Sequence, residues 1–80
     1  MLTLTPQERA LALHTLHTAG IQGSDADTSL ATLTRLAEAP SLDAWLTQHK
    51  GATPQALSAR YGHDNARAAL VLTRHLPTPP

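Results

Sequence analysis

The apolar residues of this chain recur every three or four positions, which is the spacing of a helix that buries one face. After Pro6, for example, Leu13 and Leu16 are three apart, and Leu30 and Leu33 repeat the interval. Each such stripe is expected to face a common core. The residues expected to face inward are Ala10, Leu13, Leu16, Leu30, Leu33, Leu36, Ala37, Leu42, Trp45, Leu46, His49, Ala68, Val71, Leu72, His75 and Leu76.

Residues that start and stop helices divide the chain into five segments. Thr5, Pro6 and Glu8 predict a capping box at the first start. Gly20 before Ile21 is typical of a Schellman ending. The other expected starts are Ser24, Ser41, Thr53 with Pro54, and Asp64 or His63, and the other expected stops are Pro40, Gly51, Gly62 and Pro77. The sequence predicts an all-α fold, a compact bundle of about five short helices over residues 1–76, with a flexible Pro-rich tail at 77–80.

Composition supports helices and argues against a sheet. Leu and Ala, both strong helix formers, supply most of the 41% apolar content, and Ile21 and Val71 are the only β-branched apolar residues. Trp45 and Tyr61 are the only aromatic residues. Because 80 residues bury only a modest core, net stability should be small. We expect pairing into a homodimer to add to it.

The chain has no cysteine, which excludes disulfides, thiolate metal sites and cysteine nucleophiles. Its N-terminus lacks the basic start and apolar run of a signal peptide. The longest apolar stretch, residues 68–72, is far too short to span a membrane. We therefore expect a cytoplasmic protein without membrane association. Five arginines against one lysine suggest a bacterial, GC-rich source.

Charge divides the neutral chain into two halves. Residues 1–49 hold two basic and five acidic residues, whereas residues 50–80 hold four basic residues and one acidic residue. An acidic half and a basic half predict a surface with two electrostatic characters.

Five histidines raise the question of a metal site. His14 and His17 are three residues apart, so they share a helix face and could bind one ion. Glu8, Asp25 and His49 are the only candidates for a further ligand, and no known zinc motif is matched. The prediction is that no metal or other cofactor is bound, although histidines can make a protein pH-sensitive.

Catalytic motifs are absent from the sequence. The serines are explained as helix caps or surface residues, and none follows a nucleophile-elbow pattern. The four glycines stand singly, so no phosphate-binding loop is present. A bundle of this size also has little room for a deep pocket. The chain is therefore predicted not to be an enzyme.

Residues 54–76 resemble a helix-turn-helix DNA-binding module. A segment of eight residues, a turn with a glycine and a longer amphipathic segment have the dimensions of that motif. The residues that match its positions are Leu57, Ser58, Tyr61, Gly62 and Val71. His63 departs from the pattern, because an apolar residue usually follows the turn glycine.

The resemblance implies that residues 63–74 lie in the major groove of duplex DNA. Asn65 would then contact adenine and Arg67 guanine. The residues implied as phosphate contacts are Lys50, Arg60 and Arg74. Two copies would be needed for strong binding, since one copy offers few basic residues. The predicted function is a non-enzymatic regulator of transcription that binds duplex DNA.

A helical protein–protein interaction module, adaptor-like or antitoxin-like, is the alternative function and would not bind nucleic acid. Five short helices cannot bury every apolar residue, and the remainder would form a partner surface. The interface candidates are Leu2, Leu4, Leu11, Leu42 and Trp45. The charge asymmetry favours DNA, whereas His63, Asp64 and overall neutrality favour a protein partner.

Overall fold

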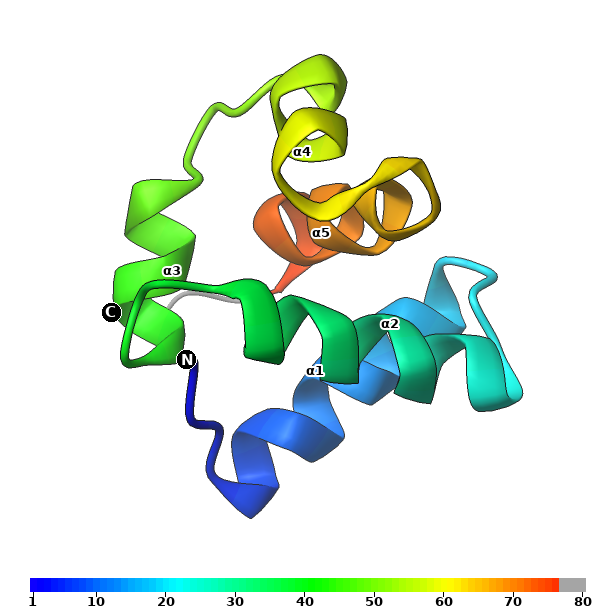
Figure 1. Cartoon of the computed structure of the whole chain (residues 1–80). Helices are drawn as coiled ribbons and strands as arrows, with labels where there is room; N and C mark the ends of the chain where they lie inside the picture. The colour runs from blue at the N-terminus through cyan, green and yellow to red at the C-terminus, as the bar shows by residue number, and fades with distance from the viewer. Residues whose placement is uncertain (77–80) are drawn as a thin grey trace.

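The computed structural model describes residues 1–76 and arranges them in five helices (Figure 1). The helices are α1 (Pro6–Thr18), α2 (Gly23–Leu36), α3 (Leu42–Gln48), α4 (Pro54–Tyr61) and α5 (His63–His75). No strand occurs in this part of the chain, so the predicted all-α bundle of five short helices is confirmed. The predicted flexible tail at 77–80 lies outside the described residues.

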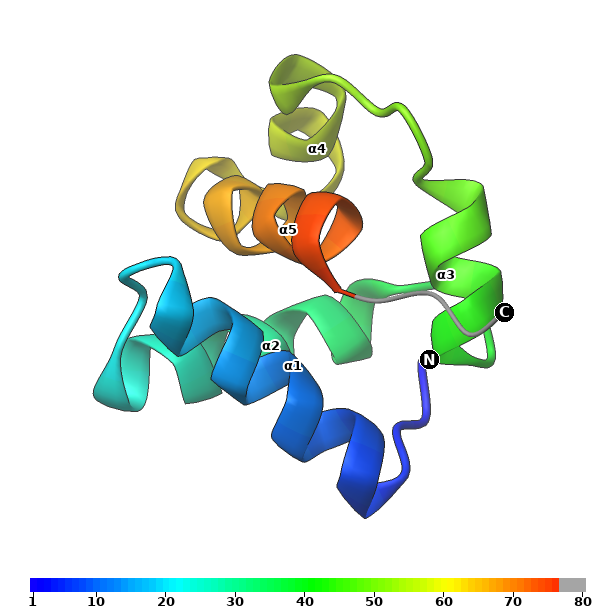
Figure 2. The ribbon, with the colours of Figure 1, turned by 180° about the vertical axis from the view of Figure 1, so that it is seen from behind.

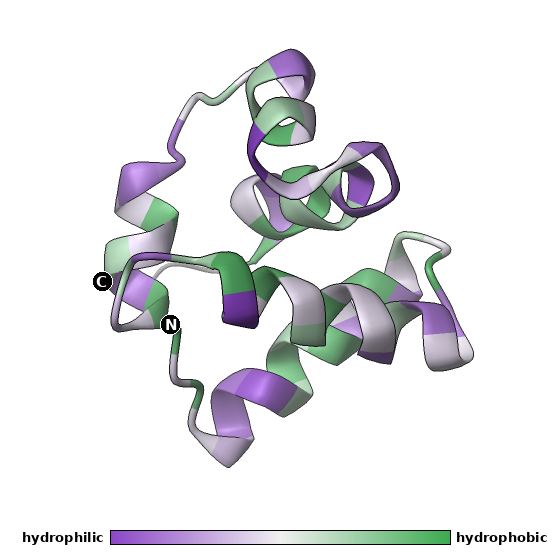
Figure 3. Ribbon diagram, in the orientation of Figure 1, coloured by the Kyte–Doolittle hydropathy of each residue, from purple (hydrophilic) through white to green (hydrophobic). Residues whose placement is uncertain are grey.

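The last helix, α5, lies at the centre of the helix packing. It packs against α4, α2 and α1, and α1 also packs against α2. By contrast, α3 lies to one side of these four helices, close to the N-terminus, as both views show (Figures 1 and 2). Hydrophobic and hydrophilic stretches alternate along the ribbon, as expected for helices that bury one side (Figure 3).

The core is built from leucine, alanine and a single tryptophan. Ala12 of α1, Ala26 of α2 and Ala69 of α5 have no exposed surface, and their small side chains allow close approach of the helices. The largest fully buried side chains are Trp45, Leu16, Leu30, Leu33 and Leu57. The interior void beside Trp45 measures about 10 Å³. That volume is at the lower limit for one water molecule, so this part of the core is densely packed.

Both ends of α1 form as predicted. The Thr5 hydroxyl accepts from the Glu8 amide at 3.1 Å, and the Glu8 carboxylate accepts from the Thr5 amide at 2.9 Å. At the other end, Gly20 has a φ of 94° and donates to the His17 carbonyl at 3.0 Å. The Ile21 amide donates to the Leu16 carbonyl at 2.9 Å. These two bonds define a Schellman ending, so the capping box and the Schellman motif are both confirmed.

The bounds of α2 differ from the prediction at both ends. It begins at Gly23 with Gln22 as its cap residue, so the predicted cap Ser24 lies inside the first turn. It ends at Leu36, four residues before Pro40, because the chain turns extended at Ala37. The ending changes which side chains are buried. Leu36, expected to face inward, is 43% exposed, whereas Ala37 is buried.

Two other inward predictions, at the edge of the apolar stripe, are wrong: Ala10 of α1 and His75 of α5 are exposed. Leu13 and Val71 are half-buried and pack against the core, as predicted. Thr15 of α1 is buried instead, and its hydroxyl donates to the Leu11 carbonyl at 2.8 Å. A threonine satisfied by its own helix backbone is compatible with burial, which a purely apolar pattern does not reveal.

The N-terminal segment contributes to the core. The Leu2 amide donates to the Thr34 carbonyl at 2.9 Å, and the Leu2 side chain is buried. This bond satisfies a carbonyl in the last turn of α2, where helix carbonyls lack partners. Because Leu2, Leu42 and Trp45 are buried, the surface role predicted for them does not fit the structure. Leu4 is half-buried against the core, and its surface role stays a prediction.

Candidate functional site

The segment resembling a helix-turn-helix consists of α4 and α5 joined by Gly62. This glycine is both the C-cap of α4 and the N-cap of α5, with a φ of 89° and a ψ of 155°. Its amide donates to the Ser58 carbonyl at 2.9 Å, which closes α4. The motif usually has a turn of three or four residues, so one residue between the helices is a departure. Neither His63 nor Asp64, the predicted caps, caps α5 with its side chain.

One face of α5 is exposed and basic. His63, Arg67 and Arg74 are exposed, and Leu70 between them is half-buried. These four residues, which we call the α5 stripe, are spaced so that they share one helix face. Arg67 and Arg74 are seven residues apart, which corresponds to about 10 Å along the helix axis. The opposite face carries the buried residues Ala66, Ala68, Ala69 and Leu72.

Two residues predicted to read bases make hydrogen bonds within the fold. The Asn65 amide nitrogen donates to the Tyr61 carbonyl at 3.0 Å, and the side chain is half-buried. The Arg67 Nη2 donates to the Ala19 carbonyl at 3.3 Å, at the C-terminal end of α1. A guanidinium has five N–H groups, so one such bond leaves donors of Arg67 for a ligand. The carboxamide of Asn65 has less capacity left.

The predicted phosphate contacts do not all lie together. Arg74 belongs to the α5 stripe, but Lys50 lies in the turn after α3 and Arg60 lies on α4. Arg60 is paired with Glu38 at 3.5 Å and lies over the ring of Tyr61, 5.9 Å from its centroid. The fold thus brings Arg67 and Arg74 to one face and leaves the other two basic residues outside the stripe.

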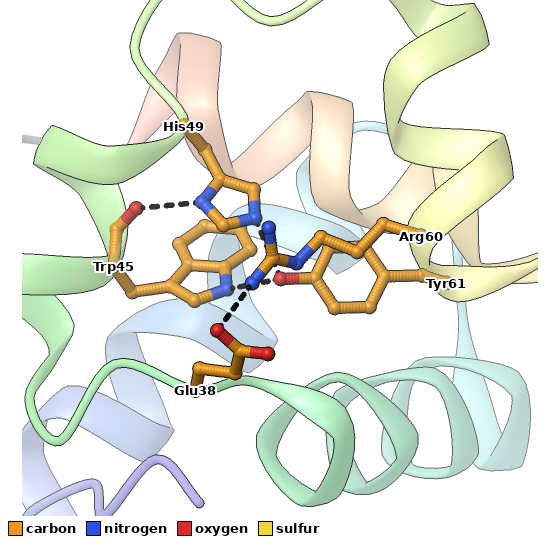
Figure 4. A network of polar contacts seen from close by, with 5 residues as sticks. All are labelled: Glu38, Trp45, His49, Arg60 and Tyr61. Atoms are coloured by element: carbon orange, nitrogen blue, oxygen red, sulfur yellow. Dashed lines mark hydrogen bonds and ion pairs between the residues drawn. The ribbon is translucent and has the colours of Figure 1, made fainter.

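A buried polar network links α3 to α4 (Figure 4). The indole Nε1 of Trp45 donates to the Tyr61 hydroxyl at 3.0 Å, and the same hydroxyl lies 2.6 Å from Nε2 of His49. The other ring nitrogen, Nδ1 of His49, lies 3.1 Å from the Trp45 carbonyl. His49 also stacks on Trp45, with ring centroids 4.6 Å apart. The apolar pattern placed Trp45 and His49 inward, and Tyr61 matched a helix-turn-helix position, but the sequence did not indicate the hydrogen bonds among the three.

The electrostatic surroundings of His49 disfavour its charged form. The side chain is only 4% exposed. Burial lowers the pKa of His49 below its ordinary value, the nearby Arg60 guanidinium lowers it further, and the hydrogen bond to the Trp45 carbonyl opposes both effects.

A shallow apolar groove lies between α1 and the end of α5. Its volume is about 420 Å³, and Leu11 of α1, 40% exposed, is its largest apolar side chain. The groove is lined by Leu11, His14, Thr15, Thr18, Ala19 and His75. None of these residues carries a formal charge when the histidines are neutral.

The predicted metal candidates His14 and His17 are both exposed on α1. His49, one of the possible further ligands, is instead used by the network with Tyr61. Within residues 1–76, no three histidine, aspartate or glutamate side chains come together in a way that could hold a metal ion.

Comparison of the chain with protein-family models, curated proteins and solved structures finds no match. Among the described residues, no helix has both the length and the apolar character needed to cross a membrane. Function is accordingly inferred from the side chains and their surroundings.

Proposed function

We propose that the protein is a small, non-enzymatic regulatory protein, located in the bacterial cytoplasm, that contacts the backbone of duplex DNA through the α5 stripe. The observation that carries the proposal is the exposure of Arg67 and Arg74 on one helix face, seven residues apart. They are about 10 Å apart along the helix axis. Two guanidinium groups on one face can each donate to phosphate oxygens of a duplex that this face contacts.

The two arginines of the α5 stripe favour an anionic ligand, although acidic side chains lie close to one of them. Asp64 is the only acidic residue after residue 49, and it lies in the first turn of α5, where it interacts favourably with the helix dipole. Asp25 of α2 lines the same hollow as Asp64 and Arg67. A stripe with two arginines makes few phosphate contacts, so one copy should bind weakly and with strong salt dependence.

The proposal assigns contacts to phosphates and not to bases. Asn65, which the helix-turn-helix resemblance would place on adenine, is held by the Tyr61 carbonyl. Phosphate contacts set the position of a protein on DNA but carry no sequence information. We therefore expect the isolated protein to bind unrelated duplexes with similar affinity.

The test is the binding of a fluorescein-labelled duplex, followed by fluorescence anisotropy over a series of salt concentrations. The variant Arg67→Ala/Arg74→Ala should bind more weakly, and the slope of log K against log salt should decrease in magnitude by about two. A matched control is Arg9→Ala/Arg35→Ala, which removes the same charge from α1 and α2. The control should retain most of the binding. Equal losses in the two variants, or no binding by the wild type in low salt, would contradict the proposal.

Self-association is a second candidate function, favoured by the groove that contains Leu11. A surface with an exposed leucine and an apolar groove is self-complementary, because in a two-fold dimer each copy can insert Leu11 into the groove of the other. The lining residues bring no lysine, arginine, aspartate or glutamate into such an interface. A homodimer would also double the phosphate contacts available to DNA.

We expect Leu11→Glu to shift the protein toward the monomer in sedimentation velocity experiments at high protein concentration. The substitution places a charge in an apolar interface while changing an exposed position, so stability should change by at most about 0.5 kcal/mol. Leu36→Glu is the matched control, since Leu36 is 43% exposed and lies on α2, outside the groove. A wild-type protein that stays monomeric at every concentration would rule out the dimer without affecting the proposal for DNA.

A further inference from the structure

The third helix is attached to the rest of the fold through one face of side chains. The other four helices pack against one another, whereas α3 lies to one side (Figures 1 and 2). Its buried residues are Leu42, Trp45 and Leu46, and His49 follows directly as its C-cap. The side-chain hydrogen bonds from this face to α4 converge on the Tyr61 hydroxyl.

The hydrogen bonds around His49 require a neutral imidazole. A carbonyl oxygen can only accept, so the proton of the ring is on Nδ1, which donates to Trp45. Nε2 then accepts from the Tyr61 hydroxyl, whose oxygen accepts from the Trp45 indole. In this series of three hydrogen bonds, every donor has one acceptor. No buried side-chain nitrogen or oxygen of the described residues is left without a partner.

A second proton on His49 would break this arrangement. It would bind to Nε2 and face the Tyr61 hydroxyl hydrogen across a contact of only 2.6 Å. The hydroxyl could turn, but its oxygen already accepts from Trp45, and its own hydrogen would lose its acceptor. A buried donor without a partner costs about 1–3 kcal/mol, and a buried charge costs more.

The surroundings compensate such a charge only in part. From α3, the Trp45 carbonyl accepts from Nδ1 and opposes the lowering of the His49 pKa. From α4, Arg60 faces the ring with a positive charge, and Tyr61 contributes only its hydroxyl. From the α2–α3 connection, the Glu38 carboxylate is paired with Arg60 (Figure 4).

We propose that His49 is an acid-sensitive latch: when its imidazole is protonated, the contact with Tyr61 breaks, the C-terminal end of α3 separates from α4, and the indole edge of Trp45 that faces Tyr61 becomes accessible to water.

The direction of the pKa shift sets the pH range in which the latch opens. In the closed form, burial and then Arg60 hold the pKa of His49 below its ordinary value of 6.5. In the open form the hydrated side chain titrates close to that value, so the open form takes up the proton first. The closed form is therefore fully favoured above about pH 6.5 and loses stability as the pH falls below it. Each pKa unit between the two forms shifts the opening equilibrium about tenfold.

The test uses the full chain, because Trp45 is its only tryptophan and reports directly on α3. Emission and acrylamide quenching are measured between about pH 8 and about pH 5. We expect the emission to move to longer wavelength and quenching to increase below about pH 6.5. Far-UV circular dichroism should retain most of its helical signal, since α3 has only seven residues.

The variants separate the latch from other effects of acid. His49→Gln stays neutral and keeps a donor and an acceptor, so both fluorescence changes should disappear. His75→Gln, at an exposed position, should retain them. In Arg60→Gln the closed-state pKa of His49 moves toward its ordinary value, and the acid-induced exposure of Trp45 should shrink. This variant tests the latch even if His49→Gln does not fold.

Three outcomes would overturn the latch. The first is a wild-type Trp45 that stays shielded from acrylamide at about pH 5. The second is acid-induced exposure that persists unchanged in His49→Gln or Arg60→Gln. The third is a complete loss of helical signal together with the fluorescence change, which would show global unfolding.

Discussion

Replacing Trp45 with alanine is expected to remove most of the protein's free energy of unfolding at room temperature. The side chain is 1% exposed and lies among core leucines. Truncating a buried tryptophan costs about 3–5 kcal/mol. Small domains have free energies of unfolding near the low end of about 5–15 kcal/mol, so the loss approaches the whole stability. Because Trp45 also holds α3 against the core, the other helices cannot replace the packing that the substitution removes.

The measurement is urea denaturation followed by far-UV circular dichroism, since the variant lacks the fluorophore. Leu36→Ala is the control, because Leu36 is 43% exposed and should change stability by about 0.5 kcal/mol or less. If Trp45→Ala and Leu36→Ala had similar midpoints, Trp45 would not belong to the core.

Tyr61→Phe is expected to have the second-largest effect, although it removes a single oxygen atom. The ring still fills its position, so no large cavity forms. The indole Nε1 of Trp45 and the Nε2 of His49 would both lose the partner they have in the structure. An unsatisfied buried polar group costs about 1–3 kcal/mol, which gives roughly 2–6 kcal/mol for the pair. The free energy of unfolding, measured in urea at neutral pH, provides the check.

A double-mutant cycle isolates the hydrogen bond between the two side chains. His49→Leu alone removes the imidazole and leaves the Tyr61 hydroxyl hydrogen without its acceptor. In the double variant Tyr61→Phe/His49→Leu neither group remains, so the combined loss should be smaller than the sum of the single losses by about 0.5–3 kcal/mol. Strictly additive losses would mean that the two side chains do not interact.

Local signals in the sequence were sufficient for the helices and for several of their ends. Thr5 with Glu8 and Gly20 with Ile21 act within one helical turn, and both motifs formed as predicted. The end of α2 could not be predicted in the same way. In its last turn the Thr34 carbonyl accepts from the amide of Leu2, which is distant in the sequence. The chain is extended at Ala37, which is buried while Leu36 is exposed, and a periodic pattern alone does not indicate this.

The same distinction between local signals and tertiary packing applies to the candidate sites. The shared face of Arg67 and Arg74 follows from helix periodicity, and the structure leaves both residues exposed on α5. The internal use of Asn65 depends on its bond to the Tyr61 carbonyl across Gly62; the sequence predicted the turn at Gly62 but not this side-chain bond. The latch joins His49 to Tyr61, which are twelve residues apart and meet through tertiary packing.

The most direct test of DNA contact through the α5 stripe is a titration of ¹⁵N-labelled protein with a short duplex in low salt, followed by NMR. We predict that the amide signals of His63, Arg67, Leu70 and Arg74 shift most, while those of α3 remain in place. The signals should return to their original positions when salt is added, because the contacts are made to phosphates. Unchanged spectra, or shifts concentrated on α3 or on the groove around Leu11, would contradict the proposed function.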